Sequence, residues 1–511
     1  MRCRDLRVLH VTPAATTRLS STLCLGIAVC LVVTAAADQQ LDICDHVEDE
    51  LTFDSVVNSA GIAITCNDGI VTLDGTVDNF LAKDRAVRLA QAVRGVRSVV
   101  NRIRIVPSTM RSDGELRADI ERALLHDPAT DSYEVAATVS DGEATLTGTV
   151  DSWQERELVA TVAKGVRGVK AITNKIDVDY QMTRSDAEIR NEIEQAIKFS
   201  VLLDPASIID VSVDSGDVSL SGSVGSASEK ARAEVLAWVA GVNNVNIEEL
   251  NVVDWADASA RRNTKWPDVS DTDVQQAVND ALLYDPRTLS FNVDVSVDNG
   301  TVTLRGTVDN LKAKRSAEQD ARNTVGVWSV NNRLMVQLDT PPTDSEIEDR
   351  IDTALLRSPA TESFEITTTV NNGIVNLYGT VDTFYEKTQA EDIASRVTGV
   401  AWVNNNLNVE NISEPYVYDP YVDFTYPYTY GWNDYDPGYT FESDAEIEED
   451  INDELWWSPF VDADEVTVAV SDGKATLTGE VDSWHERQSA AENAIEGGAT
   501  SVTNQLTIDV N

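Results

Sequence analysis

A six-fold internal repeat constrains the fold of this chain more than any other feature, because every copy must bury its core in the same way. The phrase Leu-x-Gly-x-Val recurs six times in 511 residues. The glycines of successive copies are 73, 74, 84, 73 and 100 residues apart, so two of the intervals contain insertions. These glycines are Gly75, Gly148, Gly222, Gly306, Gly379 and Gly479.

Each copy predicts the same order of elements, and the second copy illustrates it. A capping box of Ser112 and Glu115 begins a helix with apolar residues at helical spacing, and Pro128 ends that helix. Two strands of alternating polarity follow, joined by Asp141-Gly142, a dipeptide typical of tight hairpins. A longer helix and a third strand complete the unit, which predicts an α+β fold of six tandem α-β-β-α-β units. In each unit two helices cover one face of a three-stranded sheet.

Two recurring positions receive structural roles. We expect the glycine of the second strand to allow a helix to pack closely on the sheet. We expect the aspartate that follows this strand to act as the N-cap of the second helix. These aspartates are Asp78, Asp151, Asp309, Asp382 and Asp482.

The order of elements and the glycine phrase resemble the BON domain (bacterial OsmY and nodulation domain). The run Gly-Val-x-x-Val-x-Asn after the second helix, as in Gly95 to Asn101, adds to the resemblance. The resemblance covers six copies and nearly all of the chain after its N-terminal segment. It implies an exported envelope protein, often linked to osmotic stress, with proposed phospholipid binding and no enzymatic activity. The family's pattern residues are mainly structural, so the resemblance supplies no catalytic residue.

The N-terminal segment predicts a secretory signal peptide that ends at Ala37. Several arginines precede an apolar run, and small residues follow it. The alternative, a membrane anchor, requires about 20 apolar residues, and this run is shorter. We therefore expect a periplasmic or secreted protein without a transmembrane span in its mature chain. The segments are the signal peptide at 1–37, unit 1 at 38–107, unit 2 at 112–180, unit 3 at 185–253, a linker at 254–269, unit 4 at 270–338, unit 5 at 343–410, a tyrosine-rich insertion at 411–442 and unit 6 at 443–511.

The formal net charge of −46 disfavours binding to nucleic acid and long-range attraction to anionic membranes. Unit 1 is an exception, because seven basic residues and one acidic residue lie between Phe80 and Arg104. Such a basic segment suits anionic lipid or an acidic partner; the alternative is a solvated helix face paired with its own acidic neighbours. The candidate anion-binding residues are Lys83, Arg85, Arg88, Arg94, Arg97, Arg102 and Arg104.

The insertion at 411–442 holds eight of the thirteen tyrosines. Tyrosine provides contact area at low entropic cost, which is typical of recognition loops. The insertion is therefore either a partner contact or a linker packed on units 5 and 6. The candidate contact residues are Tyr421, Tyr426, Tyr428, Tyr430, Trp432, Trp456 and Trp457.

Cys44 and Cys66 are the cysteines that remain after the signal peptide, in a compartment that permits disulfides. The repeat pattern places Cys66 at a buried strand position and Cys44 at an exposed helix position. A disulfide and two unpaired thiols both stay open. The histidines lie at non-equivalent positions of the repeat, and we expect no catalytic site, metal or cofactor.

The sequence thus predicts a non-enzymatic exported repeat protein of the cell envelope. It would bind phospholipid or envelope proteins through its units, in connection with osmotic or envelope stress. The alternative is a soluble periplasmic, chaperone-like stress protein for exported clients.

Overall fold

The computed structural model describes residues 43–52, 54, 56–130, 134–180, 184–205, 207–253, 266, 269–361, 366–409 and 443–508. The predicted signal peptide and the tyrosine-rich insertion lie outside these residues, as does nearly all of the linker at 254–269. The described residues form six α+β units, each built on its own sheet, so the predicted fold class is confirmed.

The first three units follow the predicted order of elements. Unit 1 contains a helix at 43–52, the 3-10 helix η1 (Ser59–Gly61), β1 (Ile62–Asn67), β2 (Ile70–Val77), α2 (Phe80–Gln91) and β3 (Ser98–Ile105). Unit 2 contains α3 (Asp113–His126), β4 (Glu134–Ser140), β5 (Glu143–Val150), α4 (Trp153–Lys164) and β6 (Ala171–Val178). Unit 3 contains α5 (Asp186–Lys198), β7 (Ile208–Asp214), β8 (Asp217–Val224), α6 (Ala227–Leu236) and β9 (Asn244–Val252).

The last three units repeat this order. Unit 4 contains α8 (Asp271–Tyr284), β10 (Asp294–Asp298), β11 (Thr301–Val308), α9 (Leu311–Arg322) and β12 (Ser329–Val336). Unit 5 contains α10 (Asp344–Arg357), β13 (Ile366–Asn371), β14 (Ile374–Val381), α11 (Phe384–Arg396) and β15 (Trp402–Val409). Unit 6 contains α12 (Asp444–Trp457), β16 (Val466–Ser471), β17 (Lys474–Val481), α13 (Trp484–Glu496), β18 (Ser501–Asn504) and β19 (Thr507–Ile508).

The second strand is the middle strand of each sheet. It pairs antiparallel with the first strand through the hairpin and parallel with the third strand, which the second helix connects to it. Asp141 and Gly142 have φ angles of 55° and 82°, as a turn of type I′ requires, so the predicted hairpin is confirmed.

The predicted N-cap of the first helix is confirmed, whereas the predicted N-cap of the second helix is displaced by one residue. The capping box of Ser112 and Glu115 forms as predicted. The second helix begins one residue later than the aspartates imply. Ser152 caps α4 by accepting from Glu155 N, whereas the backbone N–H of Asp151 donates to the Glu155 carboxylate at 2.8 Å. The prediction that the aspartates are the caps is therefore wrong, and the capping residues are Asn79, Ser152, Ser226, Asn310, Thr383 and Ser483.

The glycine that recurs in the second strand is required for a different reason from the one predicted. Gly222 has a φ of 121°, in a region that favours glycine. A Cβ at this position would lie 2.1 Å from the carbonyl oxygen of Ile208, which belongs to the neighbouring strand β7. The close neighbour is thus a backbone carbonyl of the sheet itself and not a helix.

Cys44 and Cys66 form a disulfide, with their Cα atoms 5.8 Å apart. Both cysteines are half-buried, one on the helix at 43–52 and the other on β1. The contrast between a buried and an exposed position, which argued against an easy bridge, does not exist in unit 1.

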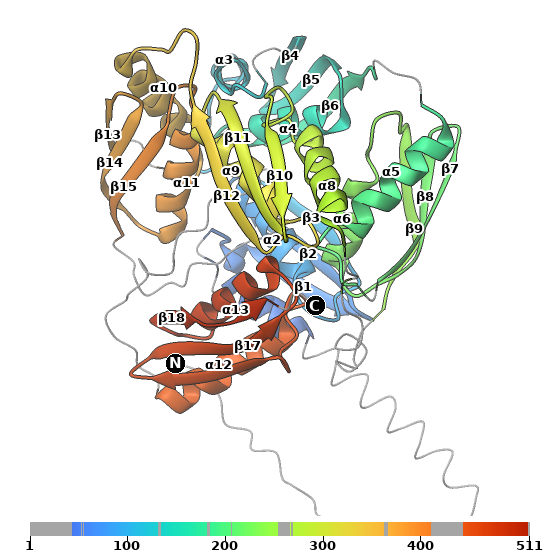
Figure 1. Ribbon diagram of the computed structural model, residues 1–511. Helices are drawn as coiled ribbons and strands as arrows, with labels where there is room; N and C mark the ends of the chain where they lie inside the picture. Colours follow the sequence, from blue (N-terminus) through green and yellow to red (C-terminus); the bar gives the residue numbers. More distant parts are fainter. Residues whose placement is uncertain are drawn as a thin grey trace, which may run out of the picture.

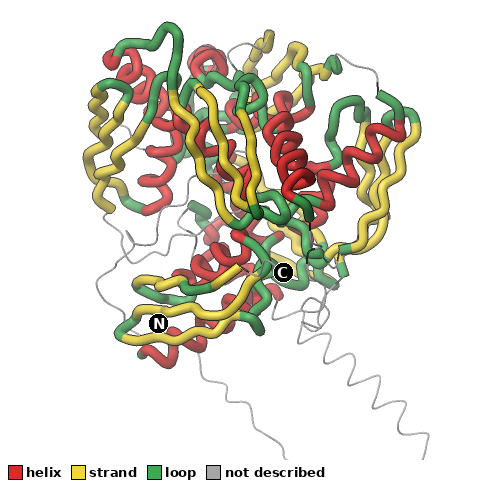
Figure 2. The backbone as a smooth tube through the Cα atoms, viewed as in Figure 1, coloured by secondary structure: helices red, strands yellow, loops and turns green. Residues whose placement is uncertain are grey.

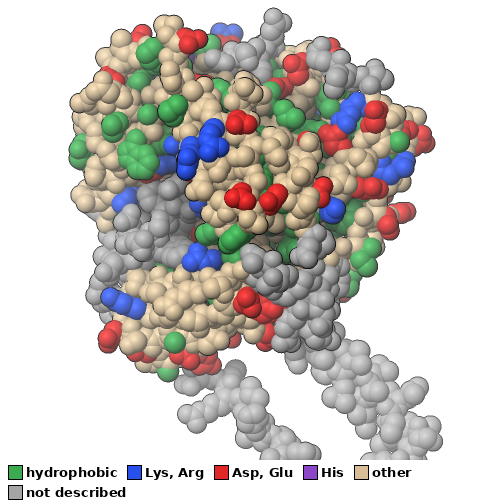
Figure 3. Space-filling view, in the orientation of Figure 1, with side chains coloured by type: hydrophobic (Ala, Val, Ile, Leu, Met, Phe, Trp, Pro, Cys, Tyr) green, Lys and Arg blue, Asp and Glu red, His purple; other side chains and the backbone are tan. Residues whose placement is uncertain are grey.

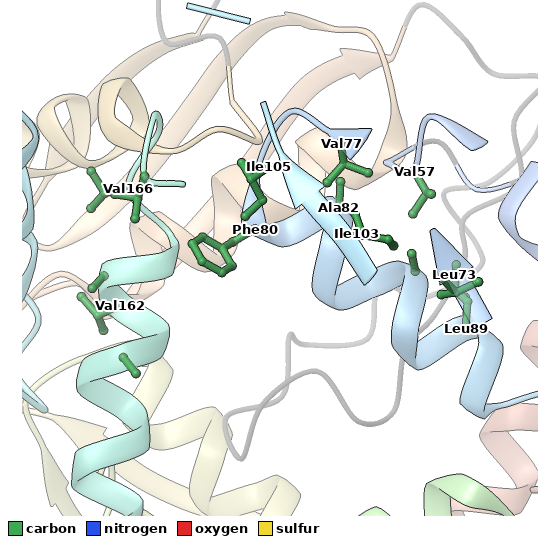
Figure 4. Close-up of a cluster of buried hydrophobic side chains, with 14 of the residues drawn as sticks. Val57, Leu73, Val77, Phe80, Ala82, Leu89, Ile103, Ile105, Val162 and Val166 are labelled. Atoms are coloured by element: carbon green, nitrogen blue, oxygen red, sulfur yellow. The ribbon is translucent and has the colours of Figure 1, made fainter. Parts of the chain in front are cut away.

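Units 1 and 2 share one hydrophobic core. Figure 4 shows Phe80 of α2 between Ile105 of its own unit and two residues of unit 2, Val162 of α4 and Val166 just after that helix. The second helix therefore has two packing faces, one against its own sheet and one against another unit.

The units contact one another in a nested order, with the outermost units of the sequence paired and the middle ones paired. Unit 1 contacts unit 6, unit 2 contacts unit 5 and unit 3 contacts unit 4. In each pair, the residue before the glycine that follows the second helix donates its N–H to a carbonyl at the end of the partner's first helix. The three bonds run from Arg94 to Trp457, from Arg167 to Arg357 and from Val325 to Phe199, at 3.1, 2.9 and 2.8 Å. As a result, sheets lie at the periphery and second helices lie toward the middle (Figures 1 and 2).

Buried ion pairs join the second helices of units 4 and 5. Lys312 Nζ lies 2.7 Å from Asp392 Oδ1, and Arg315 lies 2.6 Å from Glu391. Another buried pair, Arg287 with Asp127, joins unit 4 to unit 2 at 3.0 Å. Removing one partner of such a pair leaves a buried charge without its counter-charge, so it should destabilise the junction that the pair joins.

Acidic side chains gather where unit 6 meets unit 1. Burial, followed by the charges of Glu496 and nearby aspartates, raises the pKa of Glu454 to about 8. Burial raises the pKa of Glu496 to about 7, and the pKa of Glu50 is also raised well above its usual value, again mainly by burial. Because each folded-state pKa lies above the unfolded value, this junction holds extra protons when folded. Its stability is greatest at low pH and decreases as the pH rises toward 8.

We expect Gly222→Ala to lower the free energy of unfolding by about 1–3 kcal/mol, because the new Cβ forces the Ile208 carbonyl away from its position. Thermal unfolding of the full chain measures the change. The control is Gly114→Ala in α3, where a Cβ meets no atom within 4 Å. Equal melting temperatures for the two variants would contradict the carbonyl contact.

The raised pKa values predict that the melting temperature of the wild type falls between pH 5 and pH 8. The double variant Glu454→Gln, Glu496→Gln should show a smaller fall, because its amides do not ionise. Glu448→Gln, on the exposed face of the same helix α12, is the matched control and should behave like the wild type. An unaltered pH dependence in the double variant would show that these carboxyls do not titrate at the junction.

Candidate functional site

The basic segment of unit 1 divides between the inside and the outside of the molecule. On α2, Arg85 is 4% exposed and donates to Asp54 at 2.5 Å, and its guanidinium lies 5.4 Å from the ring centre of Tyr385 in unit 5. Arg88 lines a cavity between units, and Lys83 is half-buried. Arg85 and Arg88 therefore face neighbouring units and not an external surface.

Arg94 and the two tryptophans predicted as partner contacts meet at the junction of units 1 and 6. Arg94 Nη1 donates to the carbonyl of Trp456 at 3.1 Å, and its guanidinium lies 4.7 Å from the centre of that ring. The ring of Trp457 lies 3.8 Å from the ring of His46. These residues hold two units together, while Trp456 remains 50% exposed.

The exposed part of the basic segment lies on or beside β3. Arg97 pairs with Asp68 at 2.8 Å. Arg102 and Arg104 occupy alternate positions of the strand, so both project from the outer face of the sheet, together with exposed Val100. On this outer face, Arg102 and Arg104 are the predicted anion-binding residues that a membrane or partner outside the molecule can contact.

A cavity of ≈ 560 Å³ lies between the units. The second helices of units 1 to 5 line it, together with the C-terminal halves of α3 and α10. Seven basic and five acidic side chains line the cavity, an excess of positive charge inside a chain of net charge −46. Sequence reasoning named Arg85 and Arg88 of this set but missed the others, because the residues are dispersed over five units and no one unit carries a recognisable motif.

Three further observations bear on the predicted sites. The residues Tyr421, Tyr426, Tyr428, Tyr430 and Trp432 lie outside the described residues. Among the residues that the structure describes, no group of three or more His, Cys, Asp or Glu side chains is arranged to hold a metal ion. In the same part of the chain, no helix combines the length and the apolar character that crossing a membrane requires.

Solved structures and characterised proteins provide two comparisons. Osmotically-inducible protein Y of Escherichia coli (strain K12) is 30% identical over 126 residues, which is 24% of this chain and 63% of that protein. The match thus spans a little less than two thirds of that relative. Two structures of CdsD, a structural protein of the type III secretion system of Chlamydia trachomatis, are 15% identical with a TM-score of 0.12. They cover 44% and 47% of this chain, and 99% and 100% of their own.

The model of the BON domain family matches six segments of the chain. They are residues 39–107, 112–180, 185–254, 270–337, 343–411 and 443–509. These segments account for most of the chain, and each carries the α-β-β-α-β order described above. The resemblance seen in the sequence is confirmed, and the chain belongs to the BON domain family.

Proposed function

We propose that this chain is a non-enzymatic, exported protein of the cell envelope that binds anionic phospholipid in connection with osmotic stress. The binding surface is the outer face of the unit 1 sheet. The observation that carries the proposal is the exposure of Arg102 and Arg104 beside Val100, on the outside of an otherwise acidic protein.

The wider context supports the proposal at three points. The relative in Escherichia coli is named for its induction by osmotic change, which supports a role in osmotic stress. The basic and apolar N-terminal segment supports export. Membership of the BON family supports binding without catalysis.

A net charge of −46 repels an anionic membrane at long distance, so contact depends on local guanidinium groups. Each arginine near an anionic surface contributes about 1 kcal/mol, and the contribution disappears beyond a Debye length. Exposed apolar residues such as Val100 and Ile70 add contact area on the same face. Binding should therefore be weak, local and sensitive to salt.

A second function, shielding of exported clients, is favoured by the outer face of unit 5. Ile374, Tyr378 and Trp402 are 41%, 47% and 54% exposed on this sheet. Figure 3 shows hydrophobic side chains over the unit 5 sheet at the left of the molecule. An exposed apolar surface on a highly charged, soluble body suits transient contact with unfolded chains.

Co-sedimentation of the full chain with vesicles tests the first function. We expect retention on phosphatidylglycerol vesicles at low salt and none on phosphatidylcholine vesicles. Arg102→Gln with Arg104→Gln should lower the partition constant roughly thirtyfold, because two arginines contribute about 2 kcal/mol. Arg305→Gln with Arg333→Gln, on the outer face of the unit 4 sheet, is the matched control.

Equal loss in the two double variants would contradict a binding face on unit 1. Absence of retention, together with suppression of client aggregation that Trp402→Ser abolishes, would replace lipid binding by the second function.

A further inference from the structure

The cavity between the units exists because the tandem units nest. Its walls come from α2, α4, α6, α9 and α11, with the ends of α3 and α10 closing one region. A volume of ≈ 560 Å³ lies within the range of about 300–1,000 Å³ that small-molecule sites occupy. An isolated unit could not form this cavity.

Several carboxylates of the lining already have basic partners. Asp392 accepts from Lys312 at 2.7 Å and from Arg396 Nε at 2.9 Å. Asp127 accepts from both terminal nitrogens of Arg287 at 3.0 and 3.2 Å. These positive charges hold the pKa of both carboxyls below the usual range against the effect of burial. Both remain ionised, and their charges are balanced within the protein.

The region where α3 meets α10 differs, because two buried polar atoms there have no hydrogen-bond partner in the described part of the chain. Arg357 is 7% exposed and lines the cavity, and its Nη1 is buried without a hydrogen-bond partner among the described residues. His126 also lines the cavity, and its buried Nδ1 has no hydrogen-bond partner among the described residues either. Arg350 of α10 lies on the same lining.

The electrostatics of this region point to excess positive charge. The pKa of His126 is lowered first by burial and then by Arg357, Arg350 and Arg122. The pKa of Arg357 is lowered by burial, in part offset by Asp119. Asp119 itself accepts from Arg111 and Arg122, at 2.5 and 2.7 Å, so its charge is shared among several guanidinium groups.

We infer that this region of the cavity binds the phosphate group of a small ligand, through Arg350, Arg357 and His126. A guanidinium matches the oxygens of phosphate with two parallel hydrogen bonds, and a buried Nη1 without a partner is completed by such an oxygen. His126 supplies a further donor once the anion offsets the neighbouring arginines. Apolar residues elsewhere on the lining, including Leu158, Val162 and Val235, provide a surface against which an organic part of the ligand packs.

This site is separate from the outer face of unit 1 and does not depend on lipid binding there. Phosphate can come from the free ion or from a glycerophosphate headgroup. The chemistry recognised is the same in both cases, and the affinities tell the sources apart.

Calorimetric titration of the full chain, at constant ionic strength set with chloride, tests the site with inorganic phosphate and with glycerol 3-phosphate as probes. We expect saturable binding of at least one probe and a shift of the His126 ring resonances in NMR spectra. Arg357→Gln should weaken binding about tenfold or more, since it removes a charged hydrogen bond. Arg350→Gln, which alters a half-buried side chain, should also weaken it.

Arg117→Gln is the matched control, because Arg117 lies on the same helix as His126 but on its exposed face. It should bind like the wild type. Tighter binding of glycerol 3-phosphate identifies a headgroup as the source, and equal binding identifies the free ion; both support the site. No heat and no His126 shift with either probe, or equal weakening by Arg117→Gln and Arg350→Gln, would overturn it.

Discussion

Buried charge between the second helices of different units is the constraint on which the rest of the structure depends. Lys312 is 1% exposed and lies in unit 4, and its counter-charge, Asp392, lies in unit 5. A lysine buried without that partner would be strongly destabilising. The second helices must therefore face one another, which turns their sheets outward (Figure 1), and a charged cavity lies between these helices.

This arrangement separates two kinds of surface. The outer sheet faces differ from unit to unit, since unit 1 presents Arg102 and Arg104 while unit 5 presents Tyr378 and Trp402. The inner surface, which is the wall of the cavity, is made by several units together and carries more basic than acidic side chains. Repeating one fold six times thus provides diverse external faces without altering the cores, and creates an internal site that no single copy contains.

The parts of this structure that the sequence predicts are those set by local chemistry. The capping box at Ser112 and the turn at Asp141-Gly142 each depend on residues three or fewer positions apart. The contact of Arg94 with Trp456 joins residues 362 positions apart, and it depends on how the units nest. For the same reason Arg85 of α2 could not be recognised as buried. The cavity escaped prediction because its arginines become neighbours through packing alone.

A double-mutant cycle on Lys312 and Asp392 tests the central claim most directly. The free energies of unfolding of the wild type, Lys312→Met, Asp392→Leu and the double variant give the coupling between two helices of different units. Buried charges in direct contact should couple by about 1–3 kcal/mol, with the double variant more stable than the sum of the single effects implies. Additivity within about 0.5 kcal/mol would mean that these two charges do not meet, and would contradict the packing of second helices through buried charge.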